Sequence, residues 1–176
     1  MRILVTGGAG YIGSHTTLEL LSAGYDVVVA DNFVNSKPAV LERMRSLSSK
    51  PFDFVRCDLT DAAATEELFS QFSIDAVIHF AGLKAVGESV QKPLEYYQNN
   101  LVSTLNLLLS MKKHGVNQLV FSSSATVYGD PASVPIREDF PLSATNPYGR
   151  TKLMIEDMLR DLAFAEPQMR IGLLRY

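Results

Sequence analysis

A glycine-rich segment near the start of the chain constrains its fold more than any other feature. The segment TGGAGYIG (residues 6–13) lies between a short apolar run, Ile3–Val5, and a helical pattern, Tyr11–Ala23. Glycines at this spacing allow a sharp turn, a close approach of the backbone to a pyrophosphate, and tight packing of the helix on the strand. The helix N-terminus then offers free N–H groups to the phosphates. The three glycines of this predicted dinucleotide loop are Gly7, Gly10 and Gly13.

The rest of the chain alternates short apolar runs with longer helical patterns. Short, fully apolar strands separated by helices are typical of a parallel sheet covered on both faces, and right-handed crossovers make it doubly wound. We therefore predict an α/β fold, a Rossmann-like doubly wound parallel sheet, as one domain over residues 1–176. The expected strands are Ile3–Val5, Val27–Ala30, Phe52–Arg56, Ala76–Phe80, Leu119–Phe121 and Ile171–Leu174. The expected helices are Tyr11–Ala23, Pro38–Leu47, Ala62–Phe72, Pro93–His114 and a last one from Asn146-Pro147 to Ala165.

Composition excludes several classes of protein. A net charge of −3 argues against a nucleic-acid partner, because such proteins neutralise phosphates with basic residues. The single cysteine, Cys57, rules out an internal disulfide and suits a cytoplasmic location. No apolar run has the length that a membrane span needs, so no membrane partner is expected. Because the sequence stops at Tyr176, right at the end of the last predicted strand, we expect the N-terminal part of a longer protein, inactive by itself.

An acidic residue follows the second predicted strand, where dinucleotide-binding chains hold the adenosine ribose. Asp31 comes 18 residues after Gly13, and its carboxylate can accept hydrogen bonds from both ribose hydroxyls. The same charge would repel a 2′-phosphate, and the next residues bring no arginine to bind one. The sequence therefore favours NAD over NADP. The alternative role of Asp31 is to cap the turn that follows the strand.

Other polar residues at strand ends and on helices have more ordinary interpretations. Asp58 can hydrogen-bond an adenine amino group or, equally well, cap the next helix. Its neighbour Cys57 is interpreted as a small buried residue, and His79, inside an apolar strand, as a packed core histidine. His15 and His114 have no cysteine or carboxylate at metal-ligand spacing, so we predict no metal site.

A tyrosine and a lysine four residues apart form the second motif with chemical meaning. On a helix, Tyr148 and Lys152 share one face, one turn apart. The ammonium, the helix dipole and the positive ring of NAD are expected to lower the tyrosine pKa from about 10, which makes it a usable base. The serines 122–124 end the fifth strand, at the sheet edge that holds ligands, so a hydroxyl there can bond the same substrate alcohol. The alternative for the pair is a solvated helix face.

These motifs resemble those of the extended short-chain dehydrogenase/reductases. Residues 7–13, 80–89 and 121–129 are similar, within that family, to the enzymes that epimerise UDP-hexoses at C4. The resemblance covers the whole chain but only the N-terminal half of those enzymes. It implies NAD as the cofactor and a UDP-hexose as the substrate, whose C4 configuration changes through a 4-keto intermediate with transient hydride transfer to NAD.

The resemblance also implies roles for individual residues. Tyr148 is expected to be the base, Ser124 its partner at the sugar 4-hydroxyl, and Lys152 the ligand of the nicotinamide ribose. The sugar site is expected to include Leu83, Lys84, Ser124, Thr126 and Tyr148. Contacts to the cofactor are expected from Gly7, Gly10, Tyr11, Ile12, Gly13, Asp31, Asn32, Phe33, Val34, Asn35, Ser36, Asp58, Leu59, Phe80, Ala81, Gly82, Leu83, Lys84, Asn99, Ser124, Tyr148 and Lys152.

The resemblance further implies an assembly and narrows the chemistry. A homodimer is expected in which the helix from Pro93 and the helix from Tyr148 pair with their copies as a four-helix bundle. The resemblance also implies that a dehydratase of this family would have an Asp-Glu pair after the fifth strand, as the acid–base groups for elimination. This chain has Ala125 and Thr126 at those positions, and this difference argues against dehydration. Another nucleotide-sugar epimerase or decarboxylase, or a non-catalytic dinucleotide-binding module, are the alternatives.

Overall fold

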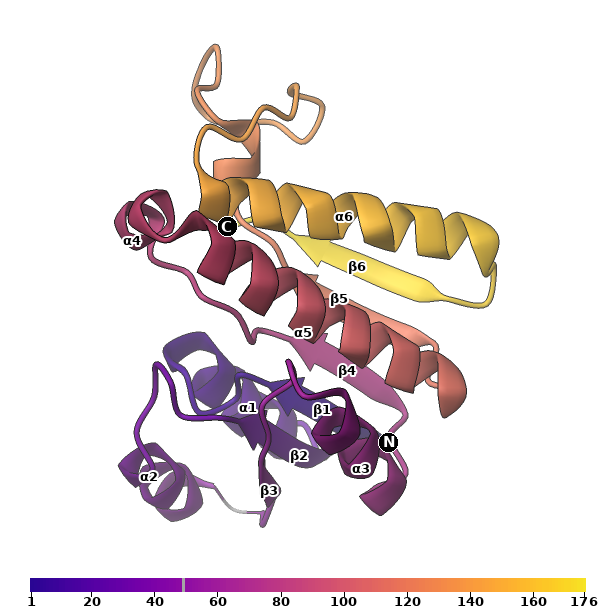
Figure 1. Ribbon diagram of the computed structural model, residues 1–176. Helices are drawn as coiled ribbons and strands as arrows, with labels where there is room; N and C mark the ends of the chain where they lie inside the picture. The colour runs from indigo at the N-terminus through magenta and orange to yellow at the C-terminus, as the bar shows by residue number, and fades with distance from the viewer. Residues whose placement is uncertain (49) are drawn as a thin grey trace.

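The computed structural model describes residues 1–48 and 50–176, which form one parallel sheet with helices on both faces (Figure 1). The strand order is β3-β2-β1-β4-β5-β6, and every neighbouring pair is parallel. This order runs outward from β1 in both directions, as in the doubly wound, Rossmann-like sheet predicted from the sequence. The strands are β1 Arg2–Thr6, β2 Asp26–Asp31, β3 Asp53–Arg56, β4 Ala76–His79, β5 Gln118–Ser122 and β6 Arg170–Leu174.

The helices agree with the sequence pattern where that pattern is long. The long helices are α1 Tyr11–Ser22, α2 Ala39–Leu47, α3 Ala62–Gln71, α5 Pro93–Lys113 and α6 Pro147–Ala165. Two shorter elements were not predicted, the helix α4, Val86–Gln91, and the 3₁₀ turn η1, Ala125–Tyr128. Neither is long enough to show a helical period of apolar residues. Within the described ranges, no helix combines the length and the apolar character needed to cross a membrane.

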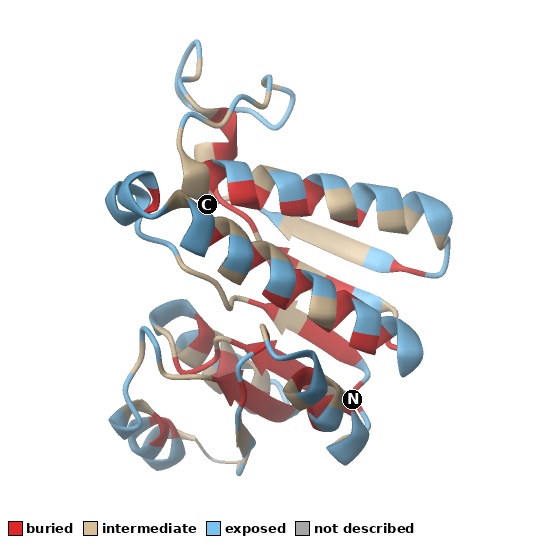
Figure 2. Cartoon of the chain, viewed as in Figure 1, coloured by how far each residue is buried: buried red, intermediate tan, exposed pale blue. Residues whose placement is uncertain are grey.

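Alternation along the strands builds two cores, one on each face of the sheet. Ile3 and Val5 of β1 pack with residues of α1 and α2, whereas Leu4 packs on the opposite face with α3, α5 and α6. Successive side chains of a strand point to opposite faces, so a continuous apolar strand supplies both cores at once. Figure 2 shows the result, with buried residues along the inner strands β1, β2, β4 and β5 and on the helix sides turned toward the sheet.

Parallel strands bring all their carboxyl ends to one edge of the sheet, and this edge positions the site. The chain leaves β1 for α1 on one face and continues after β4 to α5 on the other, so the boundary between β1 and β4 is the switch point of the sheet. Ligands of doubly wound sheets bind at such a switch point. In Figure 1, α5 and α6 lie side by side over the β4–β6 half of the sheet, which places the start of α6 at the same edge.

Candidate functional site

A cavity of about 310 Å³ lies at the carboxyl edge of the sheet, where the sequence predicts the dinucleotide. The predicted residues that line it are Gly7, Gly10, Tyr11, Ile12, Gly13, Asp31, Asn32, Val34, Asn35, Ser36, Asp58, Leu59, Phe80, Ala81, Gly82, Leu83, Lys84, Asn99, Tyr148 and Lys152. Three other predicted residues, Phe33, Ser124 and Thr126, lie outside the lining. The cavity therefore joins the glycine loop to the tyrosine–lysine pair.

The glycine loop is packed too closely for a side chain at Gly7 or at Gly13. Gly7 has a φ of +65°, and a Cβ there would lie 2.7 Å from the backbone nitrogen of Ala81. A Cβ on Gly13 would lie 2.4 Å from the carbonyl oxygen of Gly7. The loop thus folds tightly between β1 and β4, and the first turn of α1, with Tyr11 and Ile12, opens on the cavity. Such a backbone cradle fits a pyrophosphate.

Asp31 caps the turn after β2 while it lines the cavity. Its carboxylate accepts hydrogen bonds from the backbone nitrogens of Ala9 (3.1 Å) and Phe33 (2.8 Å) and from the Ser36 hydroxyl (2.8 Å). The turn interpretation of the sequence therefore holds for this residue, and the same bonds tie the glycine loop to the end of β2. Phe33, at a φ of +64°, turns its ring toward Phe54, 5.2 Å between centroids, and not into the cavity.

Asp58 is the second carboxylate of the cavity. It accepts hydrogen bonds from the backbone and hydroxyl of Thr60 and from the Asn32 amide. Burial alone would raise the Asp58 pKa, but these hydrogen bonds outweigh it and hold the pKa below its ordinary value. The cap of α3 is Asp61, whose side chain accepts from the first helical amides, so the helix-cap interpretation of Asp58 is wrong.

Two residues given structural interpretations are indeed buried. His79 is 1% exposed, with its Nδ1 atom 2.7 Å from the Thr6 hydroxyl and its Nε2 atom 3.0 Å from the Thr104 hydroxyl. Burial lowers the His79 pKa to about 3, so the ring is a neutral core group. Burial likewise raises the Cys57 pKa to about 11, which makes its thiol a poor nucleophile. Within residues 1–48 and 50–176, no group of three or more histidine, cysteine or acidic side chains is arranged so that it could hold a metal ion.

The tyrosine–lysine pair sits where α6 begins. Asn146 caps the helix by accepting a hydrogen bond of 2.8 Å from Gly149. Lys152 is 5% exposed, and its ammonium lies 5.9 Å from the centre of the Tyr148 ring and 4.8 Å from that of Phe121. Burial lowers the Lys152 pKa to about 8. A lysine that loses its proton this easily can take part in proton transfer near neutral pH.

The pKa of Tyr148 departs from the sequence-based expectation. Burial raises this pKa, and the hydroxyl of Ser124 offsets only part of the rise. The expected lowering is therefore wrong for the chain by itself, because desolvation penalises the phenolate more than its neighbours stabilise it. The contribution of the positive ring of NAD stays a prediction.

Ser124 lies between β5 and η1, beside the cavity. It is 7% exposed, and its oxygen accepts hydrogen bonds from the backbone nitrogen (3.2 Å) and the hydroxyl (2.9 Å) of Thr126. Because the oxygen accepts in both contacts, the Ser124 proton can be donated to a nearby phenolate. Ser124 thus caps η1 and presents its hydroxyl to Tyr148 at once.

The lining also contains Ala30, Cys57, Ser103 and Tyr176, which were not predicted as site residues, and Ser122 and Ser123, which were predicted only as part of the ligand-holding end of the fifth strand. Ala30 is the next-to-last residue of β2, and Cys57 and Tyr176 come shortly after β3 and β6, so their position near strand ends was a signal that could have identified them. Ser103 lies one helical turn after Asn99. Asn100 was also missed, although its amide exchanges hydrogen bonds with the backbone of Leu83 and donates to Thr151, which fixes the cavity loop to α5 and α6.

A doubly wound sheet with a glycine cradle, an acidic strand end and a tyrosine–lysine helix at one cavity defines a dinucleotide-binding domain. Comparison with known proteins specifies the class. Residues 3–176 match the NAD dependent epimerase/dehydratase family, and the chain belongs to that family.

Several relatives and solved structures resemble the chain over its whole length. It is 58% identical over 176 residues to the UDP-glucose 4-epimerase of Bacillus subtilis and 57% identical over 175 residues to that of Dictyostelium discoideum. These alignments cover 100% and 99% of this chain but 52% and 51% of the relatives. The chain therefore spans about half the length of the curated relatives it matches.

The solved structures give the same proportions. A UDP-glucose 4-epimerase from Bifidobacterium longum, in complex with NAD+ and UDP, superposes with a TM-score of 0.97 at 55% identity, over 100% of this chain and 53% of that one. The Thermus thermophilus enzyme, in complex with NAD, gives a TM-score of 0.90 at 35% identity, over 100% and 55%. The NAD expected from the sequence agrees with the family and with these neighbours.

Proposed function

We propose that this chain supplies the NAD site and the catalytic residues of a UDP-glucose 4-epimerase, which interconverts UDP-glucose and UDP-galactose. The observation that carries the proposal is the single cavity that joins the glycine loop and Asp31 to Tyr148 and Lys152. Identity of 57–58% to UDP-glucose 4-epimerases over the whole chain supports the choice of reaction.

The cavity residues suit NAD. The backbone cradle of Gly7 and Gly13 would hold the pyrophosphate, and Asp31 and Asp58 would meet the adenosine end, where two carboxylates disfavour the extra phosphate of NADP. Lys152 would hold the nicotinamide ribose. When bound, NAD would supply reversible hydride transfer at the sugar C4.

The protein residues manage the proton. Tyr148 takes the proton of the sugar 4-hydroxyl as the C–H bond breaks and gives it back when the bond re-forms. Ser124, whose hydroxyl already favours the phenolate of Tyr148, would donate to the same sugar oxygen. The positive charge of Lys152, 5.9 Å from the centre of the Tyr148 ring, is proposed to favour the phenolate further. Lys84 and Thr126 are proposed to border the sugar.

We also propose a homodimer through α5 and α6. Apolar side chains are exposed on both helices: Val102, Leu105 and Leu109 on α5 and Met154 on α6. Apolar side chains at this spacing make a stripe suited to helix–helix packing. Light scattering of Leu105→Lys tests it: we expect a monomer, while Val34→Lys, at an exposed valine elsewhere, stays a dimer. A wild-type chain that is monomeric at high concentration would contradict the proposal.

A cytoplasmic location is proposed on chemical grounds. The one cysteine of the sequence, Cys57, is a buried thiol, which a reducing compartment preserves. Cell fractionation with an antibody to the chain checks this assignment.

The activity is tested by joining this chain, at its carboxyl end, to the unmatched half of the B. subtilis relative. We expect this chimera to bind NAD and convert UDP-galactose, and its Tyr148→Phe variant to bind NAD without converting the sugar. The 176-residue chain is expected to bind NAD without turnover, because positioning of the sugar is worth about 7–11 kcal/mol. If the chimera converted only another nucleotide sugar, the result would favour a different epimerase or a decarboxylase. If it bound NAD but converted no sugar, the result would favour a binding module.

A further inference from the structure

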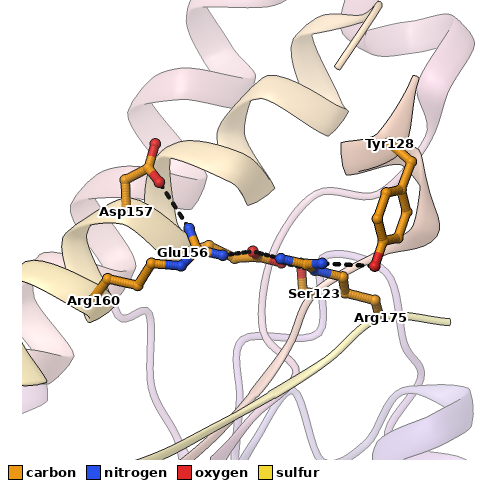
Figure 3. Close-up of polar contacts among 6 residues, drawn as sticks. All are labelled: Ser123, Tyr128, Glu156, Asp157, Arg160 and Arg175. Carbon is orange, nitrogen blue, oxygen red and sulfur yellow. Dashed lines mark hydrogen bonds and ion pairs between the residues drawn. The ribbon is translucent and has the colours of Figure 1, made fainter. Parts of the chain in front are cut away.

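A buried carboxylate on α6 has no part in the proposed chemistry, yet it lies next to the groups that do. Glu156 is 0% exposed and comes one helical turn after Lys152 (Figure 3). Its Oε1 atom accepts hydrogen bonds from the Ser123 hydroxyl (2.5 Å) and from Nε of Arg175 (2.9 Å). Its Oε2 atom accepts from Nη2 of Arg175 and Nη2 of Arg160, both at 2.6 Å. Four donors therefore satisfy one carboxylate.

The donors come from different parts of the fold. Ser123 directly follows β5, and Arg175 directly follows β6. Arg175 also donates a hydrogen bond of 2.6 Å to the Tyr128 hydroxyl and stacks over that ring, 4.9 Å from its centre, so the network reaches η1. Figure 3 shows the chain of contacts from Arg160 through Glu156 and Arg175 to Tyr128. One side chain of α6 is thus tied to two strand ends and a turn.

Charge and burial make this contact difficult to replace. Burial alone would raise the Glu156 pKa, but Arg175, Ser123 and Arg160 together hold it below its ordinary value. A buried ion pair adds little net stability over an apolar core, yet breaking one is costly because the remaining charge loses its partner. The Glu156–Arg175 ion pair therefore matters less for stability than for fixing one arrangement of the elements that it joins.

The elements joined by Glu156 are those that must be in register for the proposed reaction. Tyr148 and Lys152 belong to α6, whereas Ser122 and Ser124 flank Ser123 at the end of β5. Lys152 donates to the carbonyl oxygen of Ser122, and Ser124 faces Tyr148. The Ser123–Glu156 bond lies between these two contacts.

We propose that Glu156 is a positioning residue, whose carboxylate holds the β5–η1 junction against α6 and so sets Ser122 and Ser124 relative to Lys152 and Tyr148. This inference rests on the proposed function for the chemical roles of those four residues. The contact between the elements is a property of the chain without any nucleotide, and it can be tested there.

The test measures the pKa of Lys152 by ¹³C NMR of labelled lysines in the 176-residue chain, with Lys152→Met to assign the signal. The neighbouring titratable groups do not interfere, because His79, with a pKa near 3, and Tyr148, with a raised pKa, both stay neutral around pH 8. Glu156→Gln removes the charge and turns one acceptor into a donor. A loosened junction admits water, so we expect the Lys152 pKa to rise from about 8 toward 10.5.

The direction of the shift separates positioning from simple electrostatics. If Glu156 acted on Lys152 only through its charge, its removal would leave the neighbouring arginines uncompensated and lower the Lys152 pKa. Two control variants should leave the pKa unchanged: Asp157→Asn, which removes an adjacent exposed carboxylate, and Leu159→Ala, which weakens the core packing of the same helix.

An unchanged or lowered Lys152 pKa in folded Glu156→Gln would overturn the proposal. If that variant does not fold, Ser123→Ala decides by the same criterion, because it removes one contact of the carboxylate and leaves both arginines. A smaller rise is then expected. If the chimera failed to bind NAD or to convert the sugar, the proposed function would be contradicted. The measured Lys152 pKa would not be affected, because no nucleotide is present in the titration.

Discussion

The carbonyl oxygen of Ser122 accepts a hydrogen bond of 2.9 Å from the ammonium of Lys152, which ties the end of β5 to the helix that carries Tyr148. The lysine is almost fully buried, and burial lowers its pKa from 10.5 to about 8. Between these two values the unfolded chain holds a proton that the folded chain has lost. Stability therefore rises with pH over this window, and the charged lysine destabilises the fold at neutral pH.

Lys152→Met is expected to stabilise the chain at pH 7 by about 2 kcal/mol, because methionine fills the site without a buried charge. The advantage should disappear as the pH approaches 10.5. Urea unfolding at several pH values measures it, with Lys84→Met, at an exposed lysine of the same cavity, as the control. A Met variant that is no more stable than the parent at pH 7 would argue against a desolvated lysine.

Gly13→Ala should destabilise the chain by about 2–3 kcal/mol, since its Cβ would lie 2.4 Å from the Gly7 carbonyl oxygen and backbone would have to move. Gly87→Ala is the matched control, because a Cβ there meets no atom of the described chain within 4 Å. That variant should be neutral or slightly stabilising. Thermal unfolding measures the stability of both variants, and an equal loss of stability in the two would contradict a close-packed loop.

Asp31 is expected to set the preference between dinucleotides. The chain should bind NADH at least about tenfold more tightly than NADPH, and Asp31→Asn should narrow that ratio by weakening NADH and removing the repulsion of the 2′-phosphate. Asp53→Asn, at an exposed carboxylate of β3, should leave the ratio unchanged. Fluorescence titration of the two reduced dinucleotides measures both constants. Tighter binding of NADPH by the parent chain would contradict the assignment.

His79 should make the chain sensitive to acid. Its pKa is lowered from 6.5 to about 3, so between these values the unfolded state takes up a proton that the folded state excludes. Stability is then complete above pH 6.5 and falls by roughly 3 kcal/mol by pH 4. His79→Gln cannot take up this proton, so its free energy of unfolding should fall by roughly 3 kcal/mol less over the same pH range. Urea unfolding followed by circular dichroism measures the stability of both proteins between pH 7 and pH 4. If the two stabilities fell by the same amount, this role of His79 would be contradicted.

The sequence predicts the fold because its strands and long helices have local signals. The apolar run Ile3–Val5 indicates a strand buried on both faces, and the helix from Pro93 has a proline at its start and lysines at its end. The cavity could be predicted for a similar reason, since a parallel sheet brings every strand end to one edge. By contrast, α4 and η1 are too short to show a helical repeat of apolar residues, so the sequence did not predict them.

Features that depend on packing were beyond the sequence. The expected pKa of Tyr148 considered its charged neighbours but not its burial, which the rest of the fold determines. Phe33 has a left-handed backbone and its ring lies against that of Phe54, and a phenylalanine in the sequence gives no sign of either. The Glu156–Arg175 pair joins a helix to a strand end, so no helical or strand spacing indicates it.

The fate of the hydrogen at C4 tests the central claim most directly. The chimera with the B. subtilis half would be loaded with NAD and given UDP-galactose deuterated at C4, and the product analysed by mass spectrometry. We predict UDP-glucose that keeps the deuterium at C4, because the hydride returns to the carbon it left, and no such product from the NAD-loaded Tyr148→Phe variant. Loss of the deuterium to solvent, or undiminished turnover by Tyr148→Phe, would contradict the account.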